Sequence, residues 1–323
     1  MAEEAGSGRN DMSLSIGVSC GRENWKTCLM ENGQALELNS FVDSAAARAY
    51  LEHTCTLYPE PTIVLSSDLS TPFTRLVAVP KTCLEEMIPS HYTAEQGETL
   101  QKLLIAIGYR NINSYFAPSV RYLSSMPTHR KLMREDLGTA NNLCATAALL
   151  MQLRAREAAW SEMNLLCLEV NHNSRSIVVV EDGRIVNGMS SVARTGDQLE
   201  EASQLAFWEG LTQELAGFVA IHHFEDIVVI GQLKDAFIER FADSYQVYLF
   251  PYSQPDYEGF EAASGAATIA EGLYGQNARA EIVERLQIRE VNDSLKNEAG
   301  IVAVRATMPG TYSEECFTSA INT

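Results

Sequence analysis

The stretch LSIGVSCGRENWKTCLMENG, residues 14–33, predicts a β-hairpin followed by a second turn. Apolar residues lead into the first turn, small and polar residues form it, and Cys28 to Met30 lead out of it. Gly21 has no Cβ, so backbone N–H groups in this turn can approach a phosphate closely, and Lys26 adds positive charge nearby. The alternative interpretation is a plain N-terminal hairpin with a glycine in its turn.

The second half of the chain repeats this pattern about 150 residues further on. Residues 164–188, NLLCLEVNHNSRSIVVVEDGRIVNG, again predict strand, turn, strand, turn and strand. In both copies the second strand leads into an acidic turn that ends in glycine, Gly33 in the first copy and Gly183 in the second. The repetition predicts two related domains, residues 13–158 and 159–275, with a disordered tail at 1–12 and a C-terminal extension at 276–323.

Between the two copies and after the second, helical and strand patterns alternate. Hydrophobic spacing and capping residues predict helices at 44–57, 93–107, 138–158, 198–220 and 262–274. Short apolar runs predict strands at 62–65, 76–79, 226–231, 246–250 and 302–306. Residues 118–134 are rich in loop-forming residues. The alternation indicates an α/β protein.

Composition restricts the classes of function. The chain has 323 residues, of which 46% are hydrophobic and 20% charged, enough to build a sizeable core. Its net charge of -18 argues against binding to nucleic acid or to an anionic membrane, because both require a basic face. The seven cysteines form no Cys-x-x-Cys pair and the six histidines have no metal-ligand spacing, so we expect buried, reduced thiols and no certain metal site.

No apolar run approaches the ~20 residues that a membrane-spanning helix needs, and the first residues lack the apolar core of a signal peptide. Together with the unpaired cysteines, this predicts a cytoplasmic protein.

Three segments resemble the superfamily of actin, chaperone ATPases, sugar kinases and acetate kinase. Residues 14–33 resemble its first phosphate hairpin and residues 165–188 its second, while residues 227–231 with the helix at 262–275 resemble its adenosine region. The resemblance implies two ribonuclease-H-like domains with an interdomain cleft, the actin-like ATPase fold. It also implies ATP and Mg²⁺ as cofactors, held in that cleft by one hairpin from each domain.

A narrower resemblance is to a family of predicted butyrate kinases. Residues 118–131, PSVRYLSSMPTHRK, and 136–143, DLGTANNL, are similar to the central motifs P-S-V-x-x-L-x-T-V-P and D-x-G-T-A-D-K of that family. Residues 281–290, EIVERLQIRE, are similar to its C-terminal run. The resemblance covers residues 14–290 and implies phosphoryl transfer from ATP to a small carboxylic acid.

The chain departs from this pattern at charged positions. Ser19 stands where the superfamily has Asp or Asn, and Asn141 and Asn142 stand where the family has Asp and Lys. Glu169 is followed by Val170 and further side chains instead of glycines. Because phosphoryl transfer depends on charge around the metal and the γ-phosphate, we expect a partly degenerate phosphate site.

The candidate site residues follow from these motifs. Glu169 is the first candidate for metal or proton chemistry, with a solvated strand-end carboxylate as the alternative. Asp136 is the second, with the N-cap of the long helix as the alternative. The resemblance implies the cofactor-binding set Gly17, Ser19, Gly21, Asn24, Lys26, Gly138, Thr139, Asn171, Gly231 and Gly265.

A rare basic cluster, His129, Arg130 and Lys131, is a candidate for binding an anionic substrate, with a solvated surface as the alternative. Two functions stay open. The first is an ATP-binding carboxylate kinase acting on a small-molecule acid. The second is a catalytically inactive relative that binds a ligand or partner and has a regulatory role. An actin-like assembly protein is less favoured, and a homodimer is compatible with the sequence.

Overall fold

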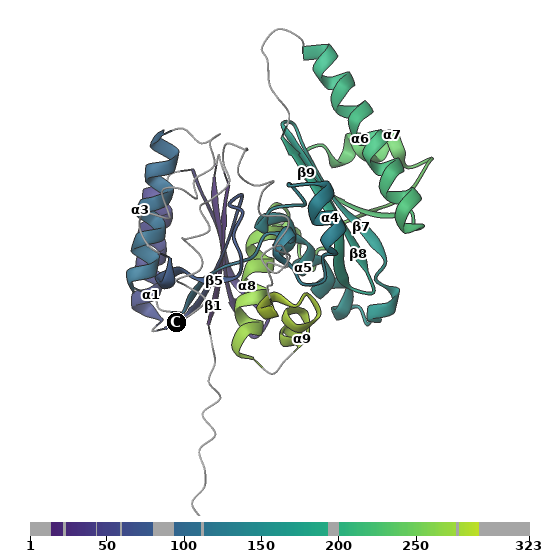
Figure 1. The fold of residues 1–323 in the computed structure, drawn as a ribbon. Coiled ribbons are helices and arrows are strands. Elements are labelled where there is room, and N and C mark those ends of the chain that lie inside the picture. Colours follow the sequence, from purple (N-terminus) through teal and green to yellow (C-terminus); the bar gives the residue numbers. More distant parts are fainter. Residues whose placement is uncertain are drawn as a thin grey trace, which may run out of the picture.

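The computed structural model describes residues 14–290, except 22–23, 43, 59, 80–93, 111–112, 193–199 and 276–277. The predicted tail at 1–12, the strand at 302–306 and the cysteines at 83 and 316 therefore lie outside the described residues. Within the described ranges, two β-sheets alternate with layers of helices (Figure 1). None of these helices combines the length and apolarity that crossing a bilayer requires.

The first sheet is built around β1. Its strands are β1 (Ser15–Cys20), β2 (Trp25–Glu31), β3 (Gln34–Phe41), β4 (Thr62–Ser67), β5 (Thr74–Arg75) and β6 (Ser114–Phe116), in the order β3-β2-β1-β4-β6-β5. β1 pairs antiparallel with β2 on one side and parallel with β4 on the other, and β6 pairs parallel with β4.

The second sheet repeats this arrangement around β7. Its strands are β7 (Leu165–Asn171), β8 (Ser174–Glu181), β9 (Arg184–Val192), β10 (Asp226–Ile230) and β11 (Gln246–Leu249), in the order β9-β8-β7-β10-β11. β7 pairs antiparallel with β8 and parallel with β10. A central strand with a hairpin on one side and parallel strands on the other, present twice, is the ribonuclease-H-like arrangement. The predicted α/β fold of two such units, the actin-like ATPase fold, is confirmed.

The helices form three layers. The first sheet carries α1 (Ser44–Leu57) and α3 (Ala94–Arg110), and the second carries α6 (Glu200–His222) and α7 (Lys234–Phe241). Between the sheets lie α5 (Ala140–Ala155) and α8 (Glu261–Tyr274), as Figure 1 shows. The remaining helices of the described ranges, α4 and α9, are Thr128–Met133 and Ala278–Arg285, and single 3₁₀ turns occupy residues 76–78, 120–122, 160–162, 255–257 and 288–290.

Alternation along the central strands decides which side chains face the middle layer. Ile16 and Val18 pack in the apolar core with α1 and α3. Because successive side chains of a strand point to opposite faces, Gly17 and Ser19 face the other way, and Gly17 touches α8. In β7, Cys167 belongs to the core that contains α5, so Glu169, two residues on, lies on the same inner face.

The two middle helices are exchanged between the halves of the chain. α5 follows the first sheet in sequence but packs in a core with β7 and β8 of the second. α8 follows the second sheet but packs against Cys28 and Met30 of the first. Contacts therefore cross the boundary that we predict at residue 158.

Several predicted elements differ from the structure. The strand expected at 76–79 is wrong: β5 is two residues long at the sheet edge, and residues 76–78 form a 3₁₀ turn. The loop-rich stretch at 118–134 contains α4. The third strand that the repeat predicts for the first copy is present as β3. β6, α7 and α9 were not predicted, because each is short and therefore weak in apolar pattern. Of the described cysteines, Cys20, Cys28, Cys144 and Cys167 are buried, as expected, and Cys55 is half-buried.

Candidate functional site

Two equivalent strand ends provide the first components of the site. Ser19 lies near the carboxyl end of β1, beside Lys26 on β2 and Ser66 on β4. Glu169 lies near the carboxyl end of β7, beside Ser176 on β8. Both belong to the inner faces of their sheets, so duplication of the fold directs one polar side chain from each sheet toward the middle layer.

The N-terminus of α5 joins these strand ends. The Ser19 hydroxyl donates a hydrogen bond to Asn141 Oδ1 at 3.1 Å, and Asn141 Nδ2 donates to Asp68 Oδ1 at 3.1 Å. Asn142 Nδ2 donates to Glu169 Oε2 at 2.9 Å and to the Ser176 hydroxyl at 2.8 Å. We call the group Ser19, Asp68, Asp136, Asn141, Asn142 and Glu169 the inter-sheet cluster.

A capping box fixes the start of α5. The Thr139 hydroxyl accepts a hydrogen bond from the Asn142 backbone N–H at 3.3 Å, and Asn142 Oδ1 accepts from the Thr139 backbone N–H at 2.9 Å. Gly138, at φ +121°, sets the turn into this cap. Thr139 is therefore the N-cap, and the alternative that Asp136 caps the helix is wrong. The Asp136 carboxylate instead accepts from the Gly138 N–H at 3.2 Å.

Desolvation and nearby acidic charge shift the titration of two carboxyl groups in the cluster. Desolvation by surrounding protein raises the pKa of Asp136 to about 6; the Gly138 hydrogen bond opposes this shift and the charge of Asp68 adds to it. Burial also raises the pKa of Glu169, with hydrogen bonds from Asn171 and Asn142 opposing and nearby acidic charges adding. The cluster thus combines a carboxylate whose pKa lies near 6, Asp136, with further carboxylates close by.

Asp68 is a site residue that the sequence analysis missed. It follows β4 directly, and its charge raises the pKa of both Asp136 and Glu169. The signal was present in the sequence, since polar residues just beyond the carboxyl end of a parallel strand commonly line α/β sites.

The first hairpin contacts the start of α8. The Gly21 N–H donates to the Asn24 carbonyl at 3.1 Å, which closes the turn. Lys26 donates to the Gly259 carbonyl, and its ammonium lies 5.4 Å from the centre of the Phe260 ring. Lys26 is thus placed where β2 meets the N-terminus of α8.

Two candidate glycines serve helix packing in this structure. A Cβ on Gly17 would lie 1.9 Å from the Ala263 carbonyl oxygen, and one on Gly265 would lie 1.7 Å from the Cys144 carbonyl oxygen. Gly17 lets α8 approach β1, and Gly265 lets α8 approach α5. Both bring the helix N-termini close to the inter-sheet cluster.

The second sheet contributes a supporting loop. Asn171 Nδ2 donates to Glu169 Oε1 at 2.9 Å, and Asn171 Oδ1 accepts from the Gln232 N–H at 3.0 Å. Gly231, at φ +101°, would bring a Cβ within 2.4 Å of the Val170 carbonyl oxygen. Asn171 and Gly231 therefore position Glu169 and the chain after β10.

The basic residues of α4 lie apart from this cluster. Arg130 donates to the Val186 carbonyl on β9, His129 is exposed, and Lys131 is buried. Arg175, in the second hairpin, forms a two-pronged ion pair with Glu214 of α6, at 2.6 and 2.9 Å. The structure does not bring these side chains to the inter-sheet cluster.

Within the described ranges, no group of three His, Cys, Asp or Glu side chains is arranged to hold a metal ion. Mg²⁺ in phosphate sites is usually held by only one or two carboxylates together with phosphate oxygens and water. Asp68 and Glu169, both hydrogen-bonded to asparagines at the start of α5, fit that limited role.

Comparisons with known proteins give the following similarities. A family model described as a protein of unknown function, DUF1464, matches residues 46–201. A comparison with curated protein sequences finds no match.

Among solved structures, the inorganic polyphosphate/ATP-glucomannokinase of Arthrobacter sp. strain KM is 12% identical, covering 81% of this chain and 100% of its own, with a TM-score of 0.46. The acetate kinase of Entamoeba histolytica is 8% identical over 72% of this chain and 87% of its own, with a TM-score of 0.47. A ROK family glucokinase of Streptomyces griseus is 10% identical over 80% of this chain and 99% of its own, with a TM-score of 0.42. The fold assignment itself follows from the order of strands in the two sheets.

Proposed function

We propose that this protein binds ATP with Mg²⁺, with the triphosphate at the inter-sheet cluster, and transfers its γ-phosphoryl group to a small carboxylic acid. The observation that supports this function is the hydrogen-bond network at the start of α5. Through Asn141 and Asn142 it connects Ser19 of the first sheet with Glu169 of the second. The site is therefore built from both copies of the repeated unit.

The N-termini of α5 and α8 are suited to phosphate. The two helices touch near their beginnings, where Gly265 meets Cys144, so their N-terminal dipoles act on the same region. Lys26 at the start of α8 adds the positive charge, and Asn24 lies two residues before it in the first hairpin. We assign phosphate contacts to Ser19, Asn24 and Lys26, and a supporting role to Asn171 and Gly231.

Asp68 and Glu169 are the residues that would hold Mg²⁺. When bound, the ion offsets negative charge on the transferring phosphoryl group. It would also offset the charge of Asp68, which adds to the desolvation that raises the pKa of Asp136 and Glu169.

The pKa of Asp136 bears on which compound accepts the phosphoryl group. A carboxylic acid is ionised at neutral pH and needs no base, whereas an alcohol must lose a proton during phosphoryl transfer. A carboxylate with a pKa of about 6 is ionised at pH 7 and is well matched to accept that proton. Phosphorylation of a hydroxyl group is therefore the second candidate function.

Calorimetry with ATP and ADP in the presence of Mg²⁺ tests the proposal. We expect binding at micromolar to millimolar concentration, and a loss of at least tenfold in the Mg²⁺-dependent affinity of Glu169→Gln. Glu239→Gln, an exposed charge removed from α7, is the matched control and should bind like the parent. Absence of nucleotide binding at millimolar concentration would contradict the function.

Turnover separates the remaining alternatives. Short-chain acids and small alcohols are each supplied with ATP, and release of ADP and formation of the phosphorylated product are followed by ³¹P NMR. Product from acids supports the carboxylate kinase, and product from alcohols only supports the second candidate. Nucleotide binding without any product would support the inactive, regulatory alternative.

A further inference from the structure

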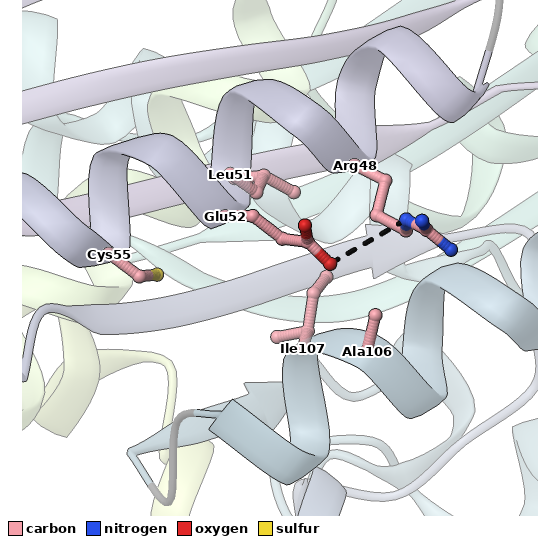
Figure 2. A pocket seen from close by; sticks show the side chains of 6 residues that line it. All are labelled: Arg48, Leu51, Glu52, Cys55, Ala106 and Ile107. Atoms are coloured by element: carbon pink, nitrogen blue, oxygen red, sulfur yellow. Dashed lines mark ion pairs between the residues drawn. The ribbon is translucent and has the colours of Figure 1, made fainter.

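A pocket of about 170 Å³ lies between α4, β9 and α6, apart from the inter-sheet cluster. Its apolar walls include Leu137 and the Phe218 ring, and its basic walls come from His129, Arg130 and Arg134. By contrast, the pocket between α1 and α3 in Figure 2 has room of only about 10 Å³, about that of one water molecule.

The lining of the larger pocket carries more basic than acidic side chains. The guanidinium of Arg134 lies 5.4 Å from the centre of the Phe218 ring, so its charge is held beside the apolar wall. Glu214, the acidic residue of the lining, is paired with Arg175 through two hydrogen bonds. Three basic side chains therefore face the pocket in a chain whose net charge is -18.

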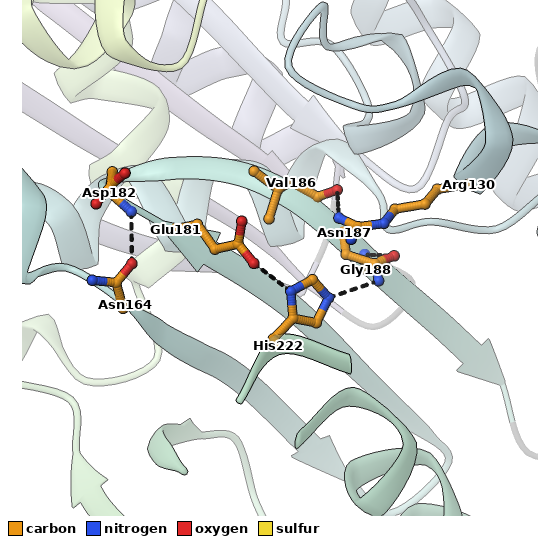
Figure 3. A network of polar contacts seen from close by, with 8 residues as sticks. All are labelled: Arg130, Asn164, Glu181, Asp182, Val186, Asn187, Gly188 and His222. Atoms are coloured by element: carbon orange, nitrogen blue, oxygen red, sulfur yellow. Dashed lines mark hydrogen bonds and ion pairs between the residues drawn. The ribbon is translucent and has the colours of Figure 1, made fainter. Parts of the chain in front are cut away.

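Hydrogen bonds hold the walls in place. Figure 3 shows Arg130 reaching the Val186 carbonyl and Asn187 meeting His222, which also pairs with Glu181. The Asn187 Nδ2 to His222 Nε2 distance is 3.0 Å. Since Asn187 lines the pocket and His222 ends α6, this network fixes α6 against β9.

Gly217 lines the pocket on the α6 side and is exposed. Glycine is among the least favourable residues within a helix, yet a Cβ at this position would meet nothing within 4 Å. Packing therefore does not require glycine here, unlike at Gly17 or Gly265. A larger side chain at 217 would occupy open space at the edge of the pocket.

We propose that this pocket binds a small carboxylate with a short apolar tail. The tail would lie against Leu137 and Phe218, and the carboxylate would meet Arg134 and Arg130. A cavity of about 150 Å³ is known to accept benzene, so about six to eight non-hydrogen atoms fit here. The size and charge together select a short-chain acid.

This inference goes beyond the proposed function, because it holds whether or not the chain transfers phosphate. Residues 134–137 connect the pocket with the inter-sheet cluster. Arg134 and Leu137 line the pocket, and Asp136, which lies between them in sequence, belongs to the inter-sheet cluster. The bound acid is accordingly either the acceptor of the phosphoryl group or an effector, and the turnover of a pocket variant, described below, distinguishes these two roles.

Calorimetry with acetate, butyrate, hexanoate and decanoate tests the proposal, with butanol and butylamine as neutral and cationic analogues. We expect affinity to rise about fourfold per methylene up to hexanoate and to fall for decanoate, which exceeds the pocket. The analogues should bind at least tenfold more weakly than butyrate. Equal binding of butylamine and butyrate would overturn the proposal.

Two variants place the ligand. Gly217→Leu should weaken butyrate binding at least tenfold, while Ala216→Leu, on the exposed side of the same helix, should leave it unchanged. Arg134→Gln, at an exposed position, should weaken butyrate binding at least fivefold. It provides the test if Gly217→Leu proves unstable. Parent-like binding by folded Gly217→Leu or Arg134→Gln, judged by circular dichroism, would overturn the assignment.

Nucleotide binding is measured on the same variants, so that failure of this proposal is distinct from failure of the proposed function. Gly217→Leu should retain binding of ATP. If it loses phosphorylation of butyrate as well as binding, the bound acid is the acceptor. If turnover continues and only butyrate binding is lost, the bound acid is an effector.

Discussion

Neutral residues occupy the centre of this site, and their hydrogen bonds satisfy one another and the neighbouring carboxylates. Ser19 and Asn141 bond to each other, and Asn142 satisfies both the Glu169 carboxylate and its own helix cap. A lysine in place of Asn142 would lose the capping contact to Thr139. The acidic charge of the site therefore comes from Asp68, Asp136 and Glu169, and from Glu261 at the start of α8, which acts on Glu169.

At the residue scale, we predict that Asp136→Asn changes the pH dependence of both activity and stability. The acidic limb of kcat/KM, with an apparent pKa near 6, should disappear or move if Asp136 acts as a base. The folded-state pKa lies above the ordinary value, so the ionised carboxyl destabilises the fold at pH above about 6. Below about pH 4 the carboxyl is protonated in both states, and this difference vanishes.

Thermal denaturation of the parent and of Asp136→Asn measures this effect. Because the Asp136 side chain is exposed, solvent screens its charge and the difference in stability is small. We expect the Asn variant to be more stable by less than about 1 kcal/mol, or roughly 2 °C in Tm, at pH 7–8, and equally stable near pH 3. A difference in Tm that does not vary with pH would show that Asp136 titrates normally.

At the element scale, α8 depends on two glycine contacts that admit no side chain. The Cβ of alanine at 17 or 265 would lie within 2 Å of a backbone oxygen, so the helix would have to move. We predict that Gly17→Ala and Gly265→Ala each lower the free energy of unfolding by about 1–3 kcal/mol. Urea denaturation at equilibrium measures the change.

Gly217→Ala is the control for this prediction, because a Cβ there meets nothing within 4 Å. Its helix propensity should raise the free energy of unfolding by up to about 1 kcal/mol. If all three glycine variants behaved alike, close approach of α8 to β1 and α5 would not explain the losses.

At the scale of the whole molecule, the exchange of α5 and α8 makes each sheet depend on the other half of the chain. The inner face of the first sheet is covered by α8, and that of the second by α5. We predict a single cooperative transition in calorimetry of the intact chain, because neither sheet keeps its cover alone. Residues 1–158 expressed alone should lack cooperative unfolding and should aggregate. Two separate transitions, or a folded fragment 1–158, would contradict this prediction.

The local pattern of residues was sufficient to predict the repeated hairpins, the helix Ser44–Leu57 at its observed bounds and the α/β class. These features depend on hydrophobic spacing and turn residues within a few positions of one another. The same patterns placed Glu169 at a strand end, where the structure has it, and Ser19 within the first hairpin.

Contacts between residues far apart in the chain are determined only by the tertiary structure. Ser19 and Asn141 are 122 positions apart, and the fold alone makes Asp68 their neighbour. Gly17 and Gly265 resemble phosphate-loop glycines in sequence, but folding packs them against helices. Hydrogen-bond partners, burial and shifted pKa values arise from such long-range contacts, which one-dimensional spacing does not encode.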